Sequence, residues 1–251
     1  MTVREIYEYL DEIAPFSDAA SWDNSGLIVG SMDAYVEKIV ICLDVNNAVI
    51  DFAVKENAQL ILSHHPVIFK PLSRFDDNCL AYTAAVNKIN IISAHTNLDK
   101  APGGVNDILC ETIGAPYIKA SPDICCGFLN IIETENELTA ADLVLLLKQR
   151  LNTHVSYCDT GKKFNRIGVC CGSGADFVSE AFSIGCNAFI TGEASYHDFL
   201  DAKNSGVSLF ACGHFETEAP VIEKLRKFLS DRFDSLTILD YVEKNSVITE
   251  S

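Results

Sequence analysis

The chain has 251 residues, of which 48% are hydrophobic and 22% are charged, and its formal net charge is −16. This length permits one large α/β domain or two small ones. The acidic charge disfavours nucleic acid or an anionic membrane as the main partner, and solubility is its simplest explanation. Because the longest apolar runs are far shorter than a membrane span and the chain does not open on an apolar signal-peptide core, we expect a cytoplasmic protein.

The first predicted element is a helix that ends at Pro15. Thr2 and Glu5 have the spacing of a capping box, and an apolar stripe follows at helical spacing: Val3, Ile6, Tyr7, Leu10 and Ile13. A loop is expected over residues 21–30.

Strands and helices then alternate along the first half. The predicted strands cover residues 38–43, 60–62 and 89–93, and the predicted helices cover 48–56 and 80–86. This alternation predicts a mostly parallel sheet with helices on both faces.

The second half shows the same alternation. Its predicted elements are a strand over 166–171, a helix over 175–183, a strand over 188–191 and a last strand over 236–242. Between the halves we predict a strand over 128–132, a helix capped by Thr139 with Asp142, and a strand over 154–157.

The two halves align without a gap when Ile39 is placed on Ile167, so that Cys42 falls on Cys170 and Leu62 on Ile190. After a deletion, His95 and Asp99 fall on His214 and Glu218. We therefore predict an α/β fold of two pseudo-repeated lobes, with a site in the crevice between them. The expected boundaries are 1–116 for the N-terminal lobe, 117–165 for a connecting segment and 166–251 for the C-terminal lobe.

Four of the six histidines follow predicted strands, and two carboxylates lie close behind them. The adjacent pair His64-His65 follows one strand, and His95 and His214 follow two others. Asp99 and Glu218 each come four residues after a histidine, counted from His95 and His214. Such a spacing is common by chance, but imidazoles and carboxylates delivered together from strand ends are what a divalent metal site needs.

Each part of this cluster has a structural alternative. His64 and His65 fit a buried pair bonded to backbone carbonyls. Glu218 fits the first turn of a helix, where a carboxylate complements the helix dipole. Residues 95–99 are expected to form a loop, because Pro102 and two glycines follow at once.

The remaining motifs are weaker. His154 fits a structural or exposed histidine, whereas His197 follows a strand end, where it fits either a substrate contact or the surface. The run Gly172-Ser173-Gly174 could hold an anion but is better explained as a tight turn. The ten cysteines contain no C-x-x-C motif, so we expect free thiols.

Five motifs together resemble the Nif-three-like dinuclear metal-centre proteins, whose bacterial members are labelled GTP cyclohydrolase 1 type 2 homologues. In chain order they are Trp22-Asp23-Asn24-Ser25-Gly26-Leu27-Ile28-Val29-Gly30, Ser63-His64-His65-Pro66, Ala94-His95-Thr96-Asn97-Leu98-Asp99, Thr191-Gly192-Glu193 with Tyr196-His197-Asp198, and Gly213-His214-Phe215-Glu216-Thr217-Glu218. The resemblance covers essentially the whole chain.

This resemblance implies two divalent metal ions per chain. The implied ligands are His64, His65, Asp99, His214 and Glu218, with His95 beside the metals. The resemblance also implies a toroidal homohexamer, and the short connector predicts a member without the extra domain that some relatives carry. The mixed nitrogen and oxygen donors suit zinc, manganese, iron, cobalt or nickel.

Two functions follow from such a site. The first is a metal-dependent hydrolase that uses a metal-bridging hydroxide on a small-molecule substrate, which the family label suggests is a nucleotide. His95 would move a proton, and Tyr196 or His197 would orient the substrate. The second is a non-enzymatic protein that carries or senses metal or assembles with partners. Metal exchange and substrate turnover distinguish them.

Overall fold

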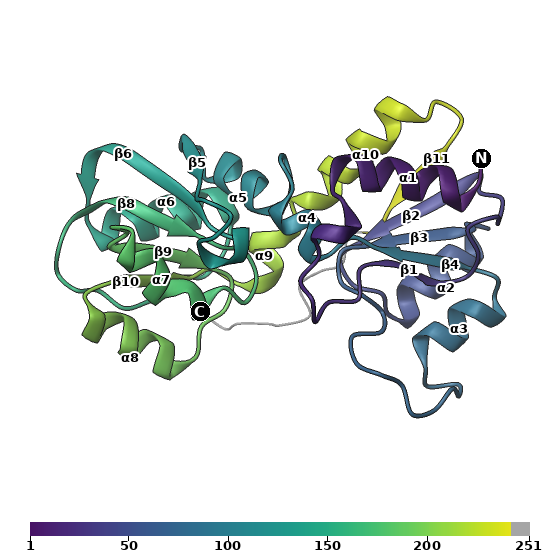
Figure 1. The fold of residues 1–251 in the computed structure, drawn as a ribbon, viewed down its shortest axis with the longest axis horizontal. Coiled ribbons are helices and arrows are strands. Elements are labelled where there is room, and N and C mark those ends of the chain that lie inside the picture. The colour runs from purple at the N-terminus through teal and green to yellow at the C-terminus, as the bar shows by residue number, and fades with distance from the viewer. Residues whose placement is uncertain (242–251) are drawn as a thin grey trace. The chain divides into compact units, whose positions relative to one another are not determined.

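The computed structural model describes residues 1–241, which fall into two compact α/β units (Figure 1). Unit 1 contains Met1–Pro102 and the described residues from Val221 onward, and unit 2 contains Gly103–Pro220. Each unit has a sheet of its own, so the predicted fold class, α/β with two sheets flanked by helices, is confirmed.

The sheet of unit 1 has the order β1-β4-β3-β2-β11. Its strands are β1 (Gly26–Val29), β2 (Lys38–Cys42), β3 (Leu60–Ser63), β4 (Asn90–Ser93) and β11 (Thr237–Asp240). β4, β3, β2 and β11 are parallel, and β1 is antiparallel to β4. The strands β3 and β4 are buried along their whole length, as expected where helices cover both faces of a parallel sheet.

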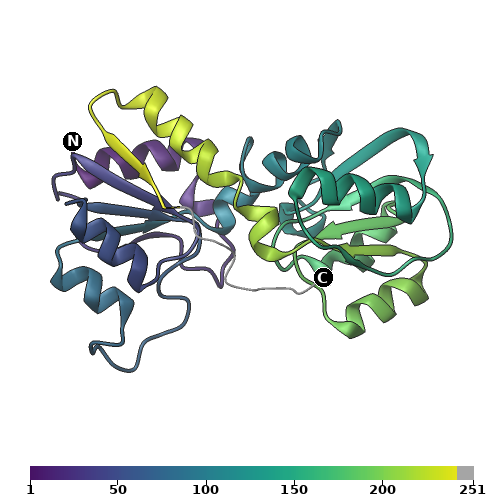
Figure 2. The same cartoon turned by 180° about the vertical axis from the view of Figure 1, so that it is seen from behind.

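Two pairs of helices cover this sheet. Helices α2 (Asn47–Lys55) and α3 (Leu80–Val86) connect successive parallel strands and pack on one face, where Val49, Ile50 and Ala84 join the apolar core. Helices α1 (Val3–Ile13) and α10 (Val221–Arg232) lie on the other face (Figures 1 and 2). The predicted capping box of α1 is present, with the Thr2 hydroxyl accepting from the Glu5 amide.

The sheet of unit 2 has the order β5-β6-β8-β9-β10-β7. Its strands are β5 (Tyr117–Lys119), β6 (Asn130–Leu138), β7 (Ser156–Tyr157), β8 (Phe164–Val169), β9 (Ala188–Thr191) and β10 (Ser208–Ala211). Only β8, β9 and β10 are parallel to one another, and the other pairings are antiparallel. The prediction of a mostly parallel sheet therefore holds for unit 1, whereas the sheet of unit 2 is mixed.

The helices of unit 2 also form two pairs. Helix α5 (Val105–Ile113) packs with α6 (Ala140–Leu151), and α7 (Val178–Ser183) packs with α8 (Tyr196–Ser205). The pairs lie on opposite faces of the sheet (Figures 1 and 2). Short helices complete the two units: α4 (Thr96–Lys100) in unit 1 and α9 (His214–Glu218) in unit 2, with 3₁₀ turns at Phe16–Asp18, Cys125–Gly127 and Ala175–Phe177.

The strand pairings of the two units follow the predicted internal repeat. Ile39 pairs with Leu60 in unit 1, and their equivalents Ile167 and Ala188 pair in unit 2. The next strands, β4 in unit 1 and β10 in unit 2, align with a different offset. Ser63 pairs with Ser93 in unit 1, and its equivalent Thr191 pairs with Ala211 in unit 2, so Ser93 corresponds to Ala211. Counting on from these pairs, His95 corresponds to Gly213 and not to His214. The expected equivalence of the two histidines was therefore wrong by one residue.

The two units divide after Pro102 and after Pro220, whereas the predicted boundaries fell after residues 116 and 165. The predicted connecting segment contributes β6 and β7 to the same sheet as β8. Helix α10 and β11 belong to unit 1, because β11 pairs in parallel with β2. The predicted strand 236–242 is β11; residue 242 and the rest of the predicted C-terminal lobe up to 251 lie outside the described residues.

Two local predictions needed correction, and two helices were not predicted at all. The expected loop at 21–30 contains β1, which gains backbone hydrogen bonds from β4. Residues 95–99 are not a loop, because Thr96–Lys100 is a short helix that begins after His95. Helices α5 and α8 were not predicted, although α5 carries buried apolar residues at helical spacing, namely Val105, Ile108, Leu109 and Ile113.

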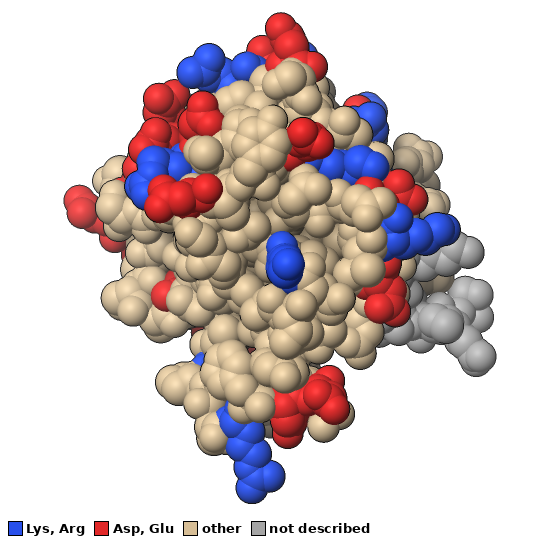
Figure 3. Space-filling model, turned by 90° about the vertical axis from the view of Figure 1, so that its right-hand side faces the viewer, with Lys and Arg blue, Asp and Glu red and all other residues tan. Residues whose placement is uncertain are grey.

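The surface view in Figure 3 shows acidic and basic side chains interspersed around a broad area that carries few charges. Within residues 1–241, no helix has the length and apolar character that crossing a membrane requires.

Candidate metal centre

The polar cluster of unit 1 lies at the carboxyl ends of three neighbouring parallel strands. Asp44 follows β2, His64 and His65 follow β3, and His95 follows β4. Because β2, β3 and β4 are parallel, their carboxyl ends meet at one edge of the sheet. One ring nitrogen from each of the three histidines lies within 4.8 Å of the others. We call His64, His65, His95 and Asp99 the first cluster.

All three imidazoles are oriented by a hydrogen bond at Nδ1. His64 donates to the Ala94 carbonyl, His65 to Asp44 and His95 to Asp23, each over 2.8 Å. A carbonyl or an ionised carboxylate can only accept, so Nδ1 carries the proton and Nε2 of each neutral ring carries the lone pair. This is how proteins orient metal-binding histidines. The structural alternative, a bond to a backbone carbonyl, is present at Nδ1 of His64. A metal bound by His64 would therefore be held by Nε2.

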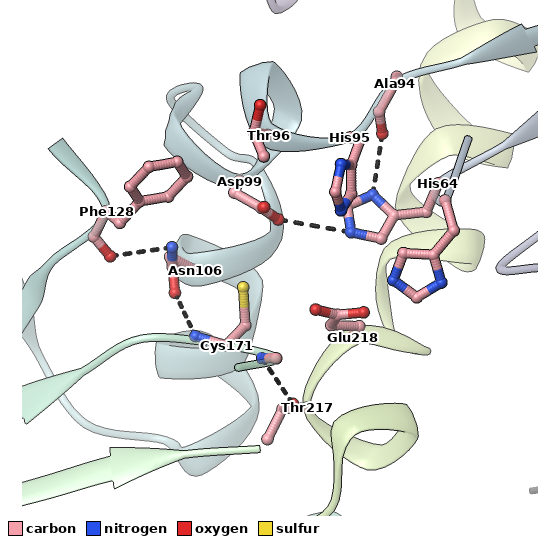
Figure 4. A network of polar contacts seen from close by, with 12 residues as sticks. His64, Ala94, His95, Thr96, Asp99, Asn106, Phe128, Cys171, Thr217 and Glu218 are labelled. Atoms are coloured by element: carbon pink, nitrogen blue, oxygen red, sulfur yellow. Dashed lines mark hydrogen bonds and ion pairs between the residues drawn. The ribbon is translucent and has the colours of Figure 1, made fainter. Parts of the chain in front are cut away.

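His64 Nε2 lies 3.5 Å from Asp99 Oδ1, and both side chains are buried (Figure 4). With Nδ1 protonated, a neutral His64 turns a lone pair toward a carboxylate oxygen. Two electron-rich atoms so close together out of water repel each other unless a proton or a metal cation neutralises them. Asp99 takes this position because α4 is one helical turn after His95, with the Asp99 amide donating to the His95 carbonyl over 3.0 Å.

Asp23 holds His95 of the first cluster in place through hydrogen bonds. Its two carboxylate oxygens accept from His95 Nδ1, the Thr96 amide and hydroxyl, and the Ser25 hydroxyl. Burial alone would raise the pKa of Asp23, but these hydrogen bonds outweigh burial and hold the pKa well below its usual range. Asp23 is therefore ionised at neutral pH, and its carboxylate favours the Nδ1–H form of His95.

The polar cluster of unit 2 repeats this arrangement with other residues. His214 Nδ1 lies 3.3 Å from Glu193 Oε2, and His214 Nε2 lies 3.1 Å from Glu218 Oε2. Glu193 also accepts from the Ser173 hydroxyl over 2.8 Å. Burial would raise the pKa of Glu193, whereas the hydrogen bonds from Ser173 and His214 lower it and prevail. We call Glu193, His214 and Glu218 the second cluster.

Backbone glycines allow the second cluster to pack tightly. Gly172 has a φ of +56°, and a Cβ there would overlap Glu218 Oε1. The amide of Gly172 donates to the Thr217 hydroxyl, and the amide of Gly174 donates to the Thr191 hydroxyl. The run Gly172-Ser173-Gly174 is thus a tight turn whose amides are bound by threonines, as the preferred explanation of the sequence held.

Glu218 lies at the end of α9 and not in the first turn of a long helix. The expected single helix is broken into α9 (His214–Glu218) and α10 (Val221–Arg232), because Pro220 has no N–H to continue the hydrogen-bond ladder. The helix-dipole explanation of Glu218 is therefore wrong. A buried carboxylate at the carboxyl end of a helix is disfavoured by the dipole and calls for a cation.

The other candidate residues lie apart from these contacts. His197 and Tyr196 are exposed at the start of α8, with their ring centroids 5.5 Å apart. His154 is exposed just before β7. All ten cysteines lie within the described residues, and none of them forms a disulfide there.

Sequence reasoning missed three carboxylates that orient the histidines: Asp23, Asp44 and Glu193. Asp44 directly follows the predicted strand 38–43, so its position was readable from the strand end. Asp23 and Glu193 stood inside motifs whose individual residues had no assigned role. Their partners, His95 and His214, are far away in the sequence.

The donors of both clusters are imidazole nitrogens and carboxylate oxygens. This combination fits divalent zinc, manganese, iron, cobalt or nickel. The orientation of every imidazole by its Nδ1 contact fits a metal more specifically than the donor types alone. The donor atoms present, and the way the imidazoles are oriented, therefore fit a divalent metal ion.

Comparisons with known proteins agree over the whole chain. The family model described as Duf34/NIF3 (NGG1p interacting factor 3) matches residues 1–245. The "GTP cyclohydrolase 1 type 2 homolog" of Clostridium perfringens is 34% identical over 245 residues, 94% of each chain. The "GTP cyclohydrolase 1 type 2" of Helicobacter pylori is 35% identical over 225 residues, 86% of each chain.

The fold is similar to that of a solved structure. Staphylococcus aureus protein SA1388 superposes with a TM-score of 0.87 at 26% identity, covering 100% of this chain and 99% of the other. The resemblance seen in the five motifs is confirmed by these matches, and the chain belongs to the Duf34/NIF3 family.

Proposed function

We propose that the chain binds two divalent metal ions and acts as a metal-dependent hydrolase. The proposed ligands are His64, His65 and Asp99 of the first cluster and His214 and Glu218 of the second. The observation that carries the proposal is the orientation of the imidazoles. In the first cluster every Nδ1 is bound to a carbonyl or carboxylate oxygen, which fixes each ring in the tautomer whose Nε2 carries the lone pair that a metal ligand uses.

Charge supports the same assignment. In each cluster an imidazole Nε2 faces a buried carboxylate, His64 toward Asp99 and His214 toward Glu218. A divalent ion satisfies both partners of such a pair at once, whereas a proton between them leaves either a charged imidazole or a protonated carboxyl group. Two divalent ions when bound supply a water made acidic near neutral pH and polarise a carbonyl or phosphoryl oxygen.

His95 is the residue we propose for proton transfer. Its Nδ1 is bound to the Asp23 carboxylate, so Nε2 is the basic nitrogen and the imidazolium formed at Nε2 would be stabilised by Asp23. This is the division of labour in which a buried carboxylate orients a histidine base. His197, exposed at the start of α8, is proposed to contact substrate and not to move protons.

The names of the relatives suggest the substrate class. Proteins 34–35% identical to this chain carry the label GTP cyclohydrolase 1 type 2 or its homologue. We propose a small-molecule substrate of the nucleotide class, and a toroidal homohexamer as the assembly, which light scattering of the purified chain would test.

The test is elemental analysis of protein purified without chelator, followed by titration with the candidate metals. We expect about two ions per chain in the wild type and a lower content in His64→Gln and Glu218→Gln. The matched controls are His154→Gln and Glu216→Gln, which should keep the wild-type content. Circular dichroism verifies that each variant is folded.

The outcomes separate the two functions. Metal that is retained, together with turnover of a nucleotide that falls in His95→Gln at unchanged metal content, supports the hydrolase. Metal that exchanges freely, together with no saturable turnover, would contradict the hydrolase and support a metal carrier or sensor. A wild-type protein that neither contains nor takes up metal contradicts both.

A further inference from the structure

Two large aromatic side chains stand exposed beside the first cluster. Trp22 is 61% exposed and Phe69 is 51% exposed. Their ring centroids lie 5.8 Å apart, and they lie 6.2 and 6.1 Å from the ring of His95. Exposed rings of this size do not contribute the free energy that their burial would supply, and exposed apolar groups that lie together often mark a binding site.

The backbone under these rings is held in place. Trp22 directly precedes Asp23, whose side chain is buried under four hydrogen bonds from His95, Thr96 and Ser25. Phe69 follows Val67 and Ile68, which pack against the apolar core of unit 1. The side-chain amide of Asn24 donates to the Ile68 carbonyl over 2.7 Å and ties the two segments together. The rings are therefore exposed but pre-organised.

We propose that Trp22 and Phe69 form an aromatic platform on which the planar heteroaromatic ring of a substrate stacks, next to His95. The two rings are tilted by 53° and touch each other, so a ligand ring would lie over them and not between them. Stacking on an aromatic face accepts any nucleobase-like ring, because every such ring presents a π-face. The proposal rests on the proposed function only in making His95 part of the reacting centre.

The geometry favours a small-molecule ring over other occupants. Both platform rings lie edge-on to His95, at interplanar angles of 75° and 76°. A ring held on the platform is thus placed beside the imidazole whose Nδ1 is fixed by Asp23, which is where a reacting substrate needs its groups positioned. The platform also explains why a tryptophan directly precedes the buried carboxylate that anchors the cluster.

The experiment uses the intrinsic fluorescence of the full chain, because Trp22 is its single tryptophan. Protein that has been incubated with zinc is titrated with guanosine 5′-monophosphate and, separately, with ribose 5-phosphate, which lacks the guanine base. We expect saturable quenching by the nucleotide and none by the sugar phosphate. Phe69→Ala should raise the Kd for the nucleotide at least about fivefold, the lower range for loss of one base–aromatic stack. Phe75→Ala, an exposed phenylalanine in the same segment, should leave the Kd unchanged.

Three results would overturn the platform: equal responses to both probes, no change of Kd in Phe69→Ala, or Trp22 emission that is shielded from acrylamide until the protein is diluted. The last would show that a second copy of the chain covers the rings. Metal content measured on the same samples keeps the two proposals apart. Normal metal with no ring binding sinks only the platform, and ring binding without metal uptake sinks only the metal centre.

Discussion

His95 Nδ1 donates to Asp23 Oδ1 over 2.8 Å, and the Asp23 side chain is completely shielded from solvent. This contact joins two segments far apart in the sequence and sets which nitrogen of His95 faces outward. The other carboxylate oxygen of Asp23 accepts three further hydrogen bonds, one from the Ser25 hydroxyl and two from the amide and hydroxyl of Thr96. The pair is thus both a structural anchor and the support of the proposed base.

Replacing Asp23 with Asn should destabilise the fold. The amide keeps the shape but loses the charge, and its NH₂ group cannot accept from the surrounding donors. We expect the free energy of unfolding to fall by roughly 2–4 kcal/mol, the range for disrupting a buried, charge-assisted hydrogen-bond network. Urea denaturation measures this. Asp33→Asn, which removes an exposed ion pair with Arg4, should change the value by less than about 0.5 kcal/mol.

The contribution of Asp23 should depend on pH in a defined direction. Its folded-state pKa is held below the unfolded value of about 3.9, so the unfolded chain binds the proton first. The stability that Asp23 supplies is complete above that value and is lost as the pH falls through the folded-state pKa. The gap in unfolding free energy between wild type and Asp23→Asn should therefore be constant from pH 7 to 5 and narrow below about pH 4. A gap that widens on acidification contradicts the assignment.

Alanine at position 172 should disturb the second cluster beyond the cost of its backbone conformation. Gly172 and Gly161 both have positive φ, +56° and +73°, so alanine at either costs about 1 kcal/mol. Only at 172 does the new Cβ overlap Glu218, whereas at 161 it meets nothing within 4 Å. Thermal unfolding should show a larger loss for Gly172→Ala. Metal titration should show weaker binding for that variant alone, and equal effects would remove Gly172 from the site.

The cysteines should differ sharply in reactivity. Cys126 is exposed, whereas burial raises the pKa of Cys110, Cys125 and Cys212 to about 12. At pH 8 these buried thiols are almost entirely protonated and therefore unreactive. Labelling of the native protein with a thiol reagent, read by mass spectrometry, should modify Cys126 first and the three buried thiols only after unfolding. Cys126→Ser should abolish the fastest phase.

Local patterns predicted much of the fold. The capping boxes of α1 and α6 are formed at Thr2 and Thr139, and the strand–helix alternation placed His64, His65 and His95 after β3 and β4 as expected. These features depend on neighbours within a few residues, so the sequence displays them directly. Helix α10 and β11 were assigned to the wrong unit, because their apolar stripes specify burial but not the surface that buries them.

Order along the chain and side-chain chemistry thus specified the α/β class, the internal repeat and the histidines at strand ends. Packing alone settled which group orients each imidazole: the Ala94 carbonyl for His64, and the carboxylates of Asp44, Asp23 and Glu193 for His65, His95 and His214. Hydrogen bonds between residues that are distant in the sequence leave no periodic trace in it. They form only when separate strands bring their ends to the same edge of a sheet, and that edge exists only in the folded chain.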